Sequence, residues 1–147
     1  MAADAWVLYN KAIEYIGDGT HDLDTHTFKI ALFTSTYVPA LTDTSYAALS
    51  GELAGSFGYT TGGETLAGVT WTEAAGVVTF DATNPSWIAS GGDLVFRYAV
   101  IYNSTDAGTA LLCYSLLDNT PADITVTDGS QYVIQFNALG IFQAAAV

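Results

Sequence analysis

Residues 94–102 read LVFRYAVIY, an almost unbroken apolar run in which Arg97 is the single charge. A second run, ALLCYSLL, follows at residues 110–117. Strands that are covered on both faces show such continuous apolar stretches, so each run predicts a central strand. The two runs are joined by a short polar connection, residues 103–109, which contains Asp106 and Gly108.

Further strands are predicted on both sides of these runs. Alternating apolar residues indicate a strand over residues 27–33, with Phe28, Ile30 and Leu32 on one face. Short connections at 74–76 and at Asp128-Gly129 predict hairpins. The other expected strands are 69–73, 77–81, 123–127, 131–137 and 139–143. Strands joined by short turns predict a mainly β chain, an antiparallel β-sandwich of jelly-roll-like type, with one domain over residues 1–147 and the sandwich over 27–143.

Two segments differ from this strand pattern. Residues 1–17 are expected to form an N-terminal helix or arm, because Trp6, Tyr9, Ile13 and Ile16 recur at helical spacing. Asp4 would favour the start of this helix, and Gly17 would end it in a left-handed conformation. Residues 34–63 are irregular and are expected to form a long excursion, with one helical turn near residues 44–49.

The charge balance excludes several classes of function. The chain has three basic residues against 15 acidic ones, a net charge of −12. Nucleic-acid binding needs Lys and Arg to contact phosphates, so we expect no nucleic-acid partner. The acidic balance also disfavours an anionic lipid surface, and no stretch approaches 18 apolar residues, so we expect no membrane partner. The N-terminus lacks the features of a signal peptide, which predicts synthesis and folding in a cytoplasm.

No pattern for catalysis or metal binding is convincing. Residues 18–26 hold two His and three Asp, but their order is not that of an EF-hand, and the glycines break any helix that could align His21 with His26. We interpret this loop as a polar connection in which Asp22 or Asp24 caps backbone amides. Nucleophile elbows and phosphate-binding glycine patterns are missing from the sequence. We therefore expect no enzyme activity, no cofactor and no metal, and we expect Cys113 to be a buried apolar residue.

Aromatic residues and one arginine are the candidates for contact with a partner. Tyr and Trp supply much of the contact energy at interfaces, and several of them lie beside turns or in the expected helix. Arg97 must either reach an edge or pair with a carboxylate, because an unpaired buried charge is very costly. The carboxylate would come from a neighbouring strand of the same chain or from across a subunit interface. The candidate interface residues are Trp6, Tyr9, Tyr37, Tyr59, Trp87 and Arg97.

A run of short motifs resembles a known family. In residues 22–39 a D-L-D element leads into F-K-I-A-L and T-S-T-Y-V-P. This block is similar to one in small virion structural proteins of tailed bacteriophages. The further matches, in a similar order, are residues 58–63, Leu66, residues 77–81, Trp87, residues 97–102 and the ending of residues 136–141.

The resemblance implies a non-catalytic virion component, and within that class we favour a head decoration (cement) protein. Such a protein would bind the major capsid protein on the capsid exterior, and we expect it to be a dimer or trimer. A tail, neck or fibre-associated virion protein is the first alternative. A carbohydrate-binding module is the second, and it predicts aromatic side chains aligned on one exposed face.

Overall fold

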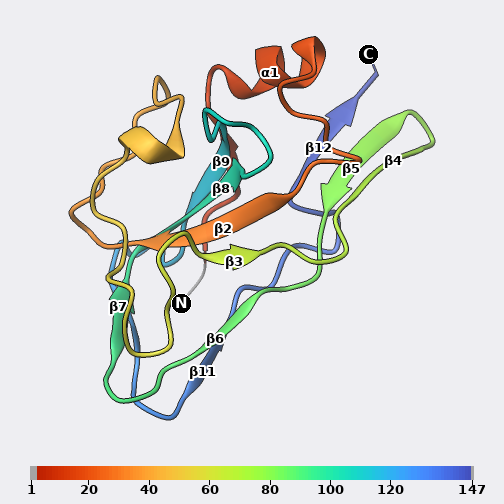
Figure 1. The fold of residues 1–147 in the computed structure, drawn as a ribbon. Coiled ribbons are helices and arrows are strands. Elements are labelled where there is room, and N and C mark those ends of the chain that lie inside the picture. The colour runs from red at the N-terminus through yellow and green to blue at the C-terminus, as the bar shows by residue number, and fades with distance from the viewer. Residues whose placement is uncertain (1–2, 147) are drawn as a thin grey trace.

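The computed structural model describes residues 3–146, and it confirms a mainly β, antiparallel fold with one short α-helix (Figure 1). One sheet has five strands in the order β1-β9-β8-β2-β3, and another has three in the order β12-β5-β4. Two pairs, β10 with β7 and β11 with β6, complete the structure. The elements are β1 (Val7–Leu8), α1 (Ala12–Asp18), β2 (Phe28–Phe33), the 3-10 helix η1 (Tyr46–Ala48), β3 (Glu64–Thr65), β4 (Thr70–Ala74), β5 (Val77–Asp81), β6 (Ser86–Ile88), β7 (Leu94–Phe96), β8 (Tyr98–Asn103), β9 (Leu111–Leu116), β10 (Ile124–Val126), β11 (Gln131–Val133) and β12 (Phe142–Ala145).

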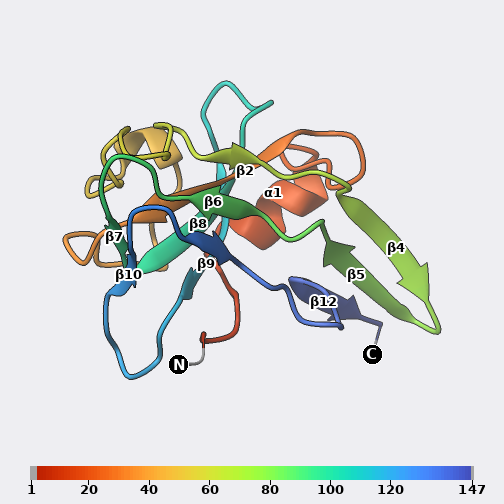
Figure 2. The ribbon, with the colours of Figure 1, turned by 90° about the horizontal axis from the view of Figure 1, so that it is seen from below.

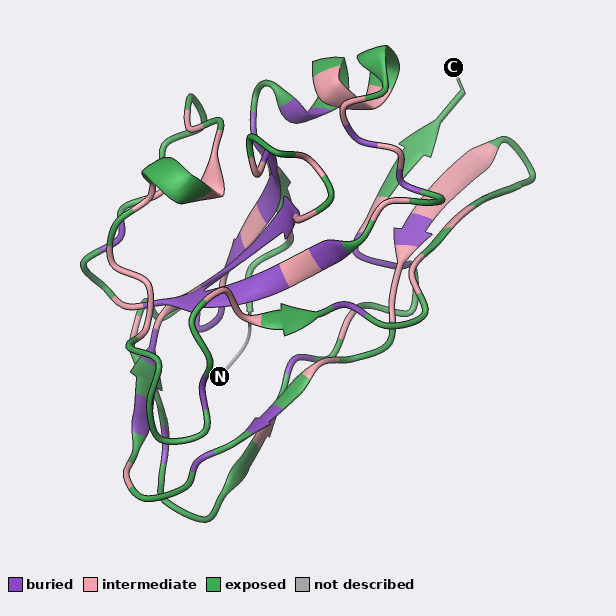
Figure 3. Ribbon diagram, in the orientation of Figure 1, coloured by how far each residue is buried: buried purple, intermediate pink, exposed green. Residues whose placement is uncertain are grey.

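The centre of the molecule is formed by β2, β8 and β9, which are buried on both faces (Figure 3). In β2, Phe28, Ile30 and Leu32 point into the larger core, as the alternation predicts. Ala31 and Phe33, on the opposite face, belong to a second cluster. Full burial of a large apolar side chain contributes roughly 1.5–3 kcal/mol, so both clusters hold this sheet in place. Cys113 is fully buried, as expected.

Arg97 divides the first apolar run into two strands, so the prediction of one continuous central strand is wrong. Before Arg97, β7 pairs with β10; after it, β8 pairs with β2 and β9. Arg97 itself bridges the central strands, because its N–H donates to the Phe33 carbonyl and its carbonyl accepts from the Leu117 N–H. The chain therefore passes from one sheet to another at the charged residue.

The predicted hairpin at Asp128-Gly129 is also wrong. The flanking strands do not pair with each other: β10 pairs with β7, and β11 pairs with β6. Residues 86–96 and 124–133 thus run side by side as one long two-stranded ribbon, which bends midway (Figure 2). At the bend, the Gly129 N–H donates to the Ala89 carbonyl, and the Asp128 carboxylate accepts from the Gly91 N–H. The turn residues bind the opposite strand of the same ribbon, and both strands bend at this point.

The hairpin at residues 74–76 is confirmed, between β4 and β5. Ala75 and Gly76 both have positive φ, which is the conformation that two-residue hairpin turns require. This hairpin and β12 project from the body of the molecule (Figure 1). The last strand lies at Phe142–Ala145, a few residues later than the expected 139–143.

The N-terminal helix is shorter than predicted. Val7 and Leu8 form β1 and pair with β9, and the helix starts only at Ala12. Gly17 lies inside the helix, and Gly19, with φ of 86°, provides the left-handed end. The helical spacing of Trp6 and Tyr9 was misleading, because pairing with a buried strand overrides weak local preference.

The excursion over residues 34–63 is confirmed as an irregular segment, and η1 supplies its helical turn. In the described part of the chain, no helix is both long and apolar enough to cross a membrane.

Candidate functional site

Most of the predicted interface aromatics are in the interior, which corrects the expectation that they face a partner. Tyr9, Tyr37, Tyr59 and Trp87 are each at most 4% exposed. Trp6 is half-buried, and its ring lies 5.9 Å from that of Phe136. Over residues 3–146, Phe57 is the most exposed aromatic residue, at 47%. The large rings fill the two cores, where they bury the most apolar area.

Two of these tyrosines form a buried hydrogen-bond chain. The Tyr9 hydroxyl lies 2.7 Å from the Tyr37 hydroxyl, which donates to the Asp43 carboxylate at 3.2 Å. Burial, more than any other cause, raises the pKa of both phenols, so both stay protonated. The chain joins the N-terminal segment to the excursion, and its role is to position these segments.

Glu52 organises the rest of the excursion. Its carboxylate accepts hydrogen bonds from the Tyr59 hydroxyl at 2.7 Å, the Gly62 N–H at 2.7 Å and the Tyr46 hydroxyl. The Tyr46 ring stacks on that of Tyr102, with centroids 4.0 Å apart, and burial raises the pKa of Tyr102 to about 12. Sequence reasoning missed Glu52, because nothing in its neighbouring residues distinguishes it from a surface acid.

The loop over residues 18–26 is a polar connection, as interpreted from the sequence. The Asp22 carboxylate accepts from the backbone N–H groups of Asp24 and Thr25, both at 3.1 Å, and from the Thr25 hydroxyl at 2.7 Å. These hydrogen bonds lower the pKa of Asp22. Over residues 3–146, no group of three or more His, Cys, Asp or Glu side chains is arranged to hold a metal ion.

Behind this loop, Asn103 and His21 form a buried polar centre. The Asn103 amide donates to the Thr20 carbonyl at 2.9 Å and to His26 Nδ1 at 3.0 Å, and its oxygen accepts from the N–H groups of Thr105 and Asp106. His21 Nε2 lies 3.0 Å from the Leu111 carbonyl, which can only accept, so this nitrogen carries the proton. The fully buried Asn103 fixes the loop to the end of β8.

Arg97 pairs within the chain, the first of its two predicted alternatives. Its Nε donates to the carboxylate of Asp123, which immediately precedes β10, at 2.8 Å. The arginine side chain is 27% exposed and Asp123 is 39% exposed. A second basic residue, Lys11, pairs with Glu14 at 2.8 Å. Two of the three basic residues are thus paired within the chain, and the 15 acidic residues leave the protein strongly negative.

The best candidate for an interaction site is the outer face of the two-stranded ribbon. Residues alternate along its strands, so that Trp87 and Tyr132 point inward while their neighbours point outward. The outward residues within the four strands are exposed and uncharged, and Ile88, Val95 and Val133 are 57%, 41% and 40% exposed. The exposed Asp93 and Asp128 lie at the bend, between the two strand pairs. We call this surface the outer ribbon face; it consists of Ser86, Ile88, Val95, Thr125, Gln131 and Val133.

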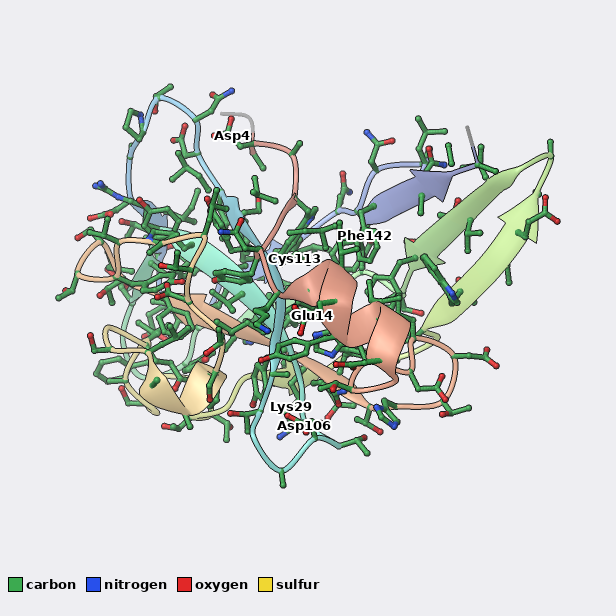
Figure 4. All side chains as sticks on the ribbon, turned by 90° about the horizontal axis from the view of Figure 1, so that it is seen from above. Asp4, Glu14, Lys29, Asp106, Cys113 and Phe142 are labelled. Carbon is green, nitrogen blue, oxygen red and sulfur yellow. The ribbon has the colours of Figure 1, made fainter. Side chains whose placement is uncertain are left out.

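A groove of about 620 Å³ lies elsewhere, between the two ends of the chain. One wall is the N-terminal segment with Asp4 and Trp6, and the other includes Phe142 and Gln143 of β12 (Figure 4). Among its lining residues Asp4 is the only charged one, and Gln135, Asn137 and Gln143 contribute amides. The groove therefore adjoins the last strand of the three-stranded sheet.

Comparison with known proteins adds no relative: no family model, no curated protein and no solved structure matches this chain.

Proposed function

We propose that this chain is a bacteriophage virion structural protein, a head decoration protein that binds the major capsid protein on the capsid exterior. The observation that carries the proposal is the outer ribbon face. On a chain of net charge −12, the six strand residues of this exposed face carry no charge, and three of the six are β-branched apolar residues. The nearest carboxylates of the ribbon, Asp93 and Asp128, lie at its bend. Exposed apolar side chains on an uncharged face are typical of a surface that contacts another protein.

The distribution of polar groups supports a binding role without chemistry. The half-buried carboxylate of Glu52 binds the buried Tyr59, and the hydroxyls of Tyr9 and Tyr37 bind each other. The Asn103 centre joins a loop to a strand. Each of these networks connects segments that are distant in the sequence. These networks hold the strands and loops in fixed positions. A surface that is already formed before binding lowers the entropic cost of binding.

Charge also favours this role. Copies of a strongly acidic chain repel one another in solution, which keeps them soluble before assembly, and packaged DNA does not attract them. Many weak contacts repeated by capsid symmetry would then bind the protein to the shell. The family resemblance of residues 22–39 and 97–102 points to the same class.

Purified phage particles that contain this chain provide the test. We expect many copies per particle, at a fixed ratio to the major capsid protein, by quantitative gel analysis. A count of only a few copies per particle would instead support the tail, neck or fibre alternative.

A variant pair tests the surface. Ile88→Lys should weaken rebinding to stripped particles by about tenfold or more, because it places a charge at the centre of an apolar contact. Thr72→Lys, on exposed β4, makes the same charge change away from the ribbon and should bind normally. Equal binding by both variants would reject the outer ribbon face as the docking surface.

A further inference from the structure

The last strand, β12, is an open and uncharged sheet edge. It is the terminal strand of the sheet β12-β5-β4, and within residues 3–146 no other strand pairs with its outer edge. Edge strands are usually protected by charged residues or proline, because their free N–H and C=O groups can pair with another chain. Residues 129–147 contain no charged residue and no proline.

The hydrogen-bond pattern identifies the backbone groups that are free to pair. Ala144 is opposite Val78, and the Ala146 N–H donates to the Gly76 carbonyl at 3.0 Å. Because bonded residues alternate along an antiparallel ladder, Ala144 also turns its backbone toward β5. Gln143 and Ala145 then direct their N–H and C=O groups outward, at the free edge.

We propose that this edge binds the same edge of a second copy, so that two chains form a two-fold symmetric dimer with one continuous six-stranded sheet. The two-fold axis passes beside Ala144. Gln143 of each copy then pairs with Ala145 of the other, and the outward groups of both residues are all satisfied. Such a contact is self-complementary, as two-fold symmetry requires.

Side-chain size fits this register. At the two-fold axis, Ala144 of one copy lies opposite Ala144 of the other in a non-hydrogen-bonded pair. In such a pair the Cα atoms approach to about 4.5 Å, so small side chains are favoured. The Gln143 side chain is already held by Thr79, to which its amide donates at 3.1 Å. The groove beside Phe142 and Gln143 leaves space for the end of the incoming strand.

Charge favours this edge over the other edge of the sheet. Two copies of charge −12 repel each other, so an approach through a charge-free segment costs least. At the opposite edge, β4 carries Glu73, which would face the same carboxylate of a second copy or lie near it. Pairing through β12 keeps the carboxylates of β4 two strands away from the axis.

Dimer formation can be measured on the purified chain alone, so this proposal does not depend on the virion role. Sedimentation velocity over a range of protein concentrations should show a monomer–dimer equilibrium. Ala144→Lys should weaken the dimer by about tenfold or more, since it places like charges opposite each other on the axis. Ala145→Pro should also weaken it, because it removes an outward N–H and leaves the ladder to β5 intact.

Thr72→Lys is the matched control, with the same charge change on an exposed residue of β4, and it should dimerise like the original chain. Thermal unfolding should show that all variants fold. A monomer at every concentration, a trimer, or a dimer that Ala144→Lys leaves unchanged would each overturn the proposal. So would equal weakening by Thr72→Lys, which would indicate a general charge effect.

Discussion

Nε of Arg97 donates a 2.8 Å hydrogen bond to the carboxylate of Asp123, at the residue where the chain leaves β7 and enters β8. The pair joins two corners, because Asp123 lies just before β10, the partner of β7. The arginine marks the change of sheet and remains partly in contact with solvent.

Replacement of Arg97 by Met should therefore cost little. A partly exposed ion pair contributes roughly 0–1 kcal/mol, and the methionine retains the apolar part of the side chain. We expect a decrease of at most about 1 kcal/mol in the free energy of unfolding, measured with urea. Arg97→Met should leave the sedimentation profile unchanged; a loss of association would instead support the subunit-interface alternative.

Asn103→Ala should be far more damaging. It removes the donors to the Thr20 carbonyl and His26 Nδ1 and the acceptor for two backbone N–H groups, in a fully buried position. Unsatisfied buried polar groups cost about 1–3 kcal/mol each, so we expect a loss of about 3 kcal/mol or more in urea unfolding. Asn119→Ala, at an exposed position, is the control and should change the stability by less than about 0.5 kcal/mol. Similar losses for both would show that Asn103 is not a structural centre.

Glu52→Gln tests whether the Glu52 carboxylate stabilises the irregular segment, residues 34–63. A glutamine retains one acceptor oxygen but turns an NH₂ group toward hydroxyls that now donate to the carboxylate. The free energy of unfolding should fall by about 1–3 kcal/mol. Glu64→Gln, on exposed β3, is the matched control and should be nearly neutral. If the two variants have the same stability, the tyrosine hydroxyls do not depend on the carboxylate.

The stability should also fall in mild acid. Burial lowers the pKa of His21 in the folded chain, whereas the unfolded chain has the ordinary value of about 6.5. Both states are neutral at His21 above this pH, and below it the unfolded state takes up a proton first. The contribution of neutral His21 is thus complete above about pH 6.5 and is lost as the pH falls through the folded pKa.

Melting temperatures measured between pH 8 and pH 5 provide the check. The decrease below pH 6.5 should be smaller in His21→Gln, which does not titrate in this range. Asp18, Asp22 and Asp118, whose pKa values are lowered by hydrogen bonds, act only below about pH 4. An unchanged slope in the variant would assign the effect to other groups.

Much of the fold could be predicted because local patterns coincide with tertiary burial. The strand at residues 27–33, the hairpin at 74–76 and the polar loop at Asp22 depend on neighbouring residues only. The candidate site was less predictable. Five interface residues were chosen because they are aromatic, and four of these are core residues, since a ring beside a turn has the same sequence pattern whether it points inward or outward. Local alternation in residues 86–88 and 124–126 was the signal available for the outer ribbon face.

The sequence by itself determined the class of fold and the charge of the surface, because strand periodicity and net charge need no knowledge of distant residues. Only the tertiary structure decided which strands pair. Asp128-Gly129 has the composition of a hairpin turn, but β10 and β11 pair with β7 and β6. The pairing of β10 with β7 places Leu94, Phe96, Ile124 and Val126 together in the larger core. Residues 94–102 likewise have the sequence pattern of one strand. The division at Arg97 depends on its contacts with Phe33, Leu117 and Asp123, which form only in the folded chain.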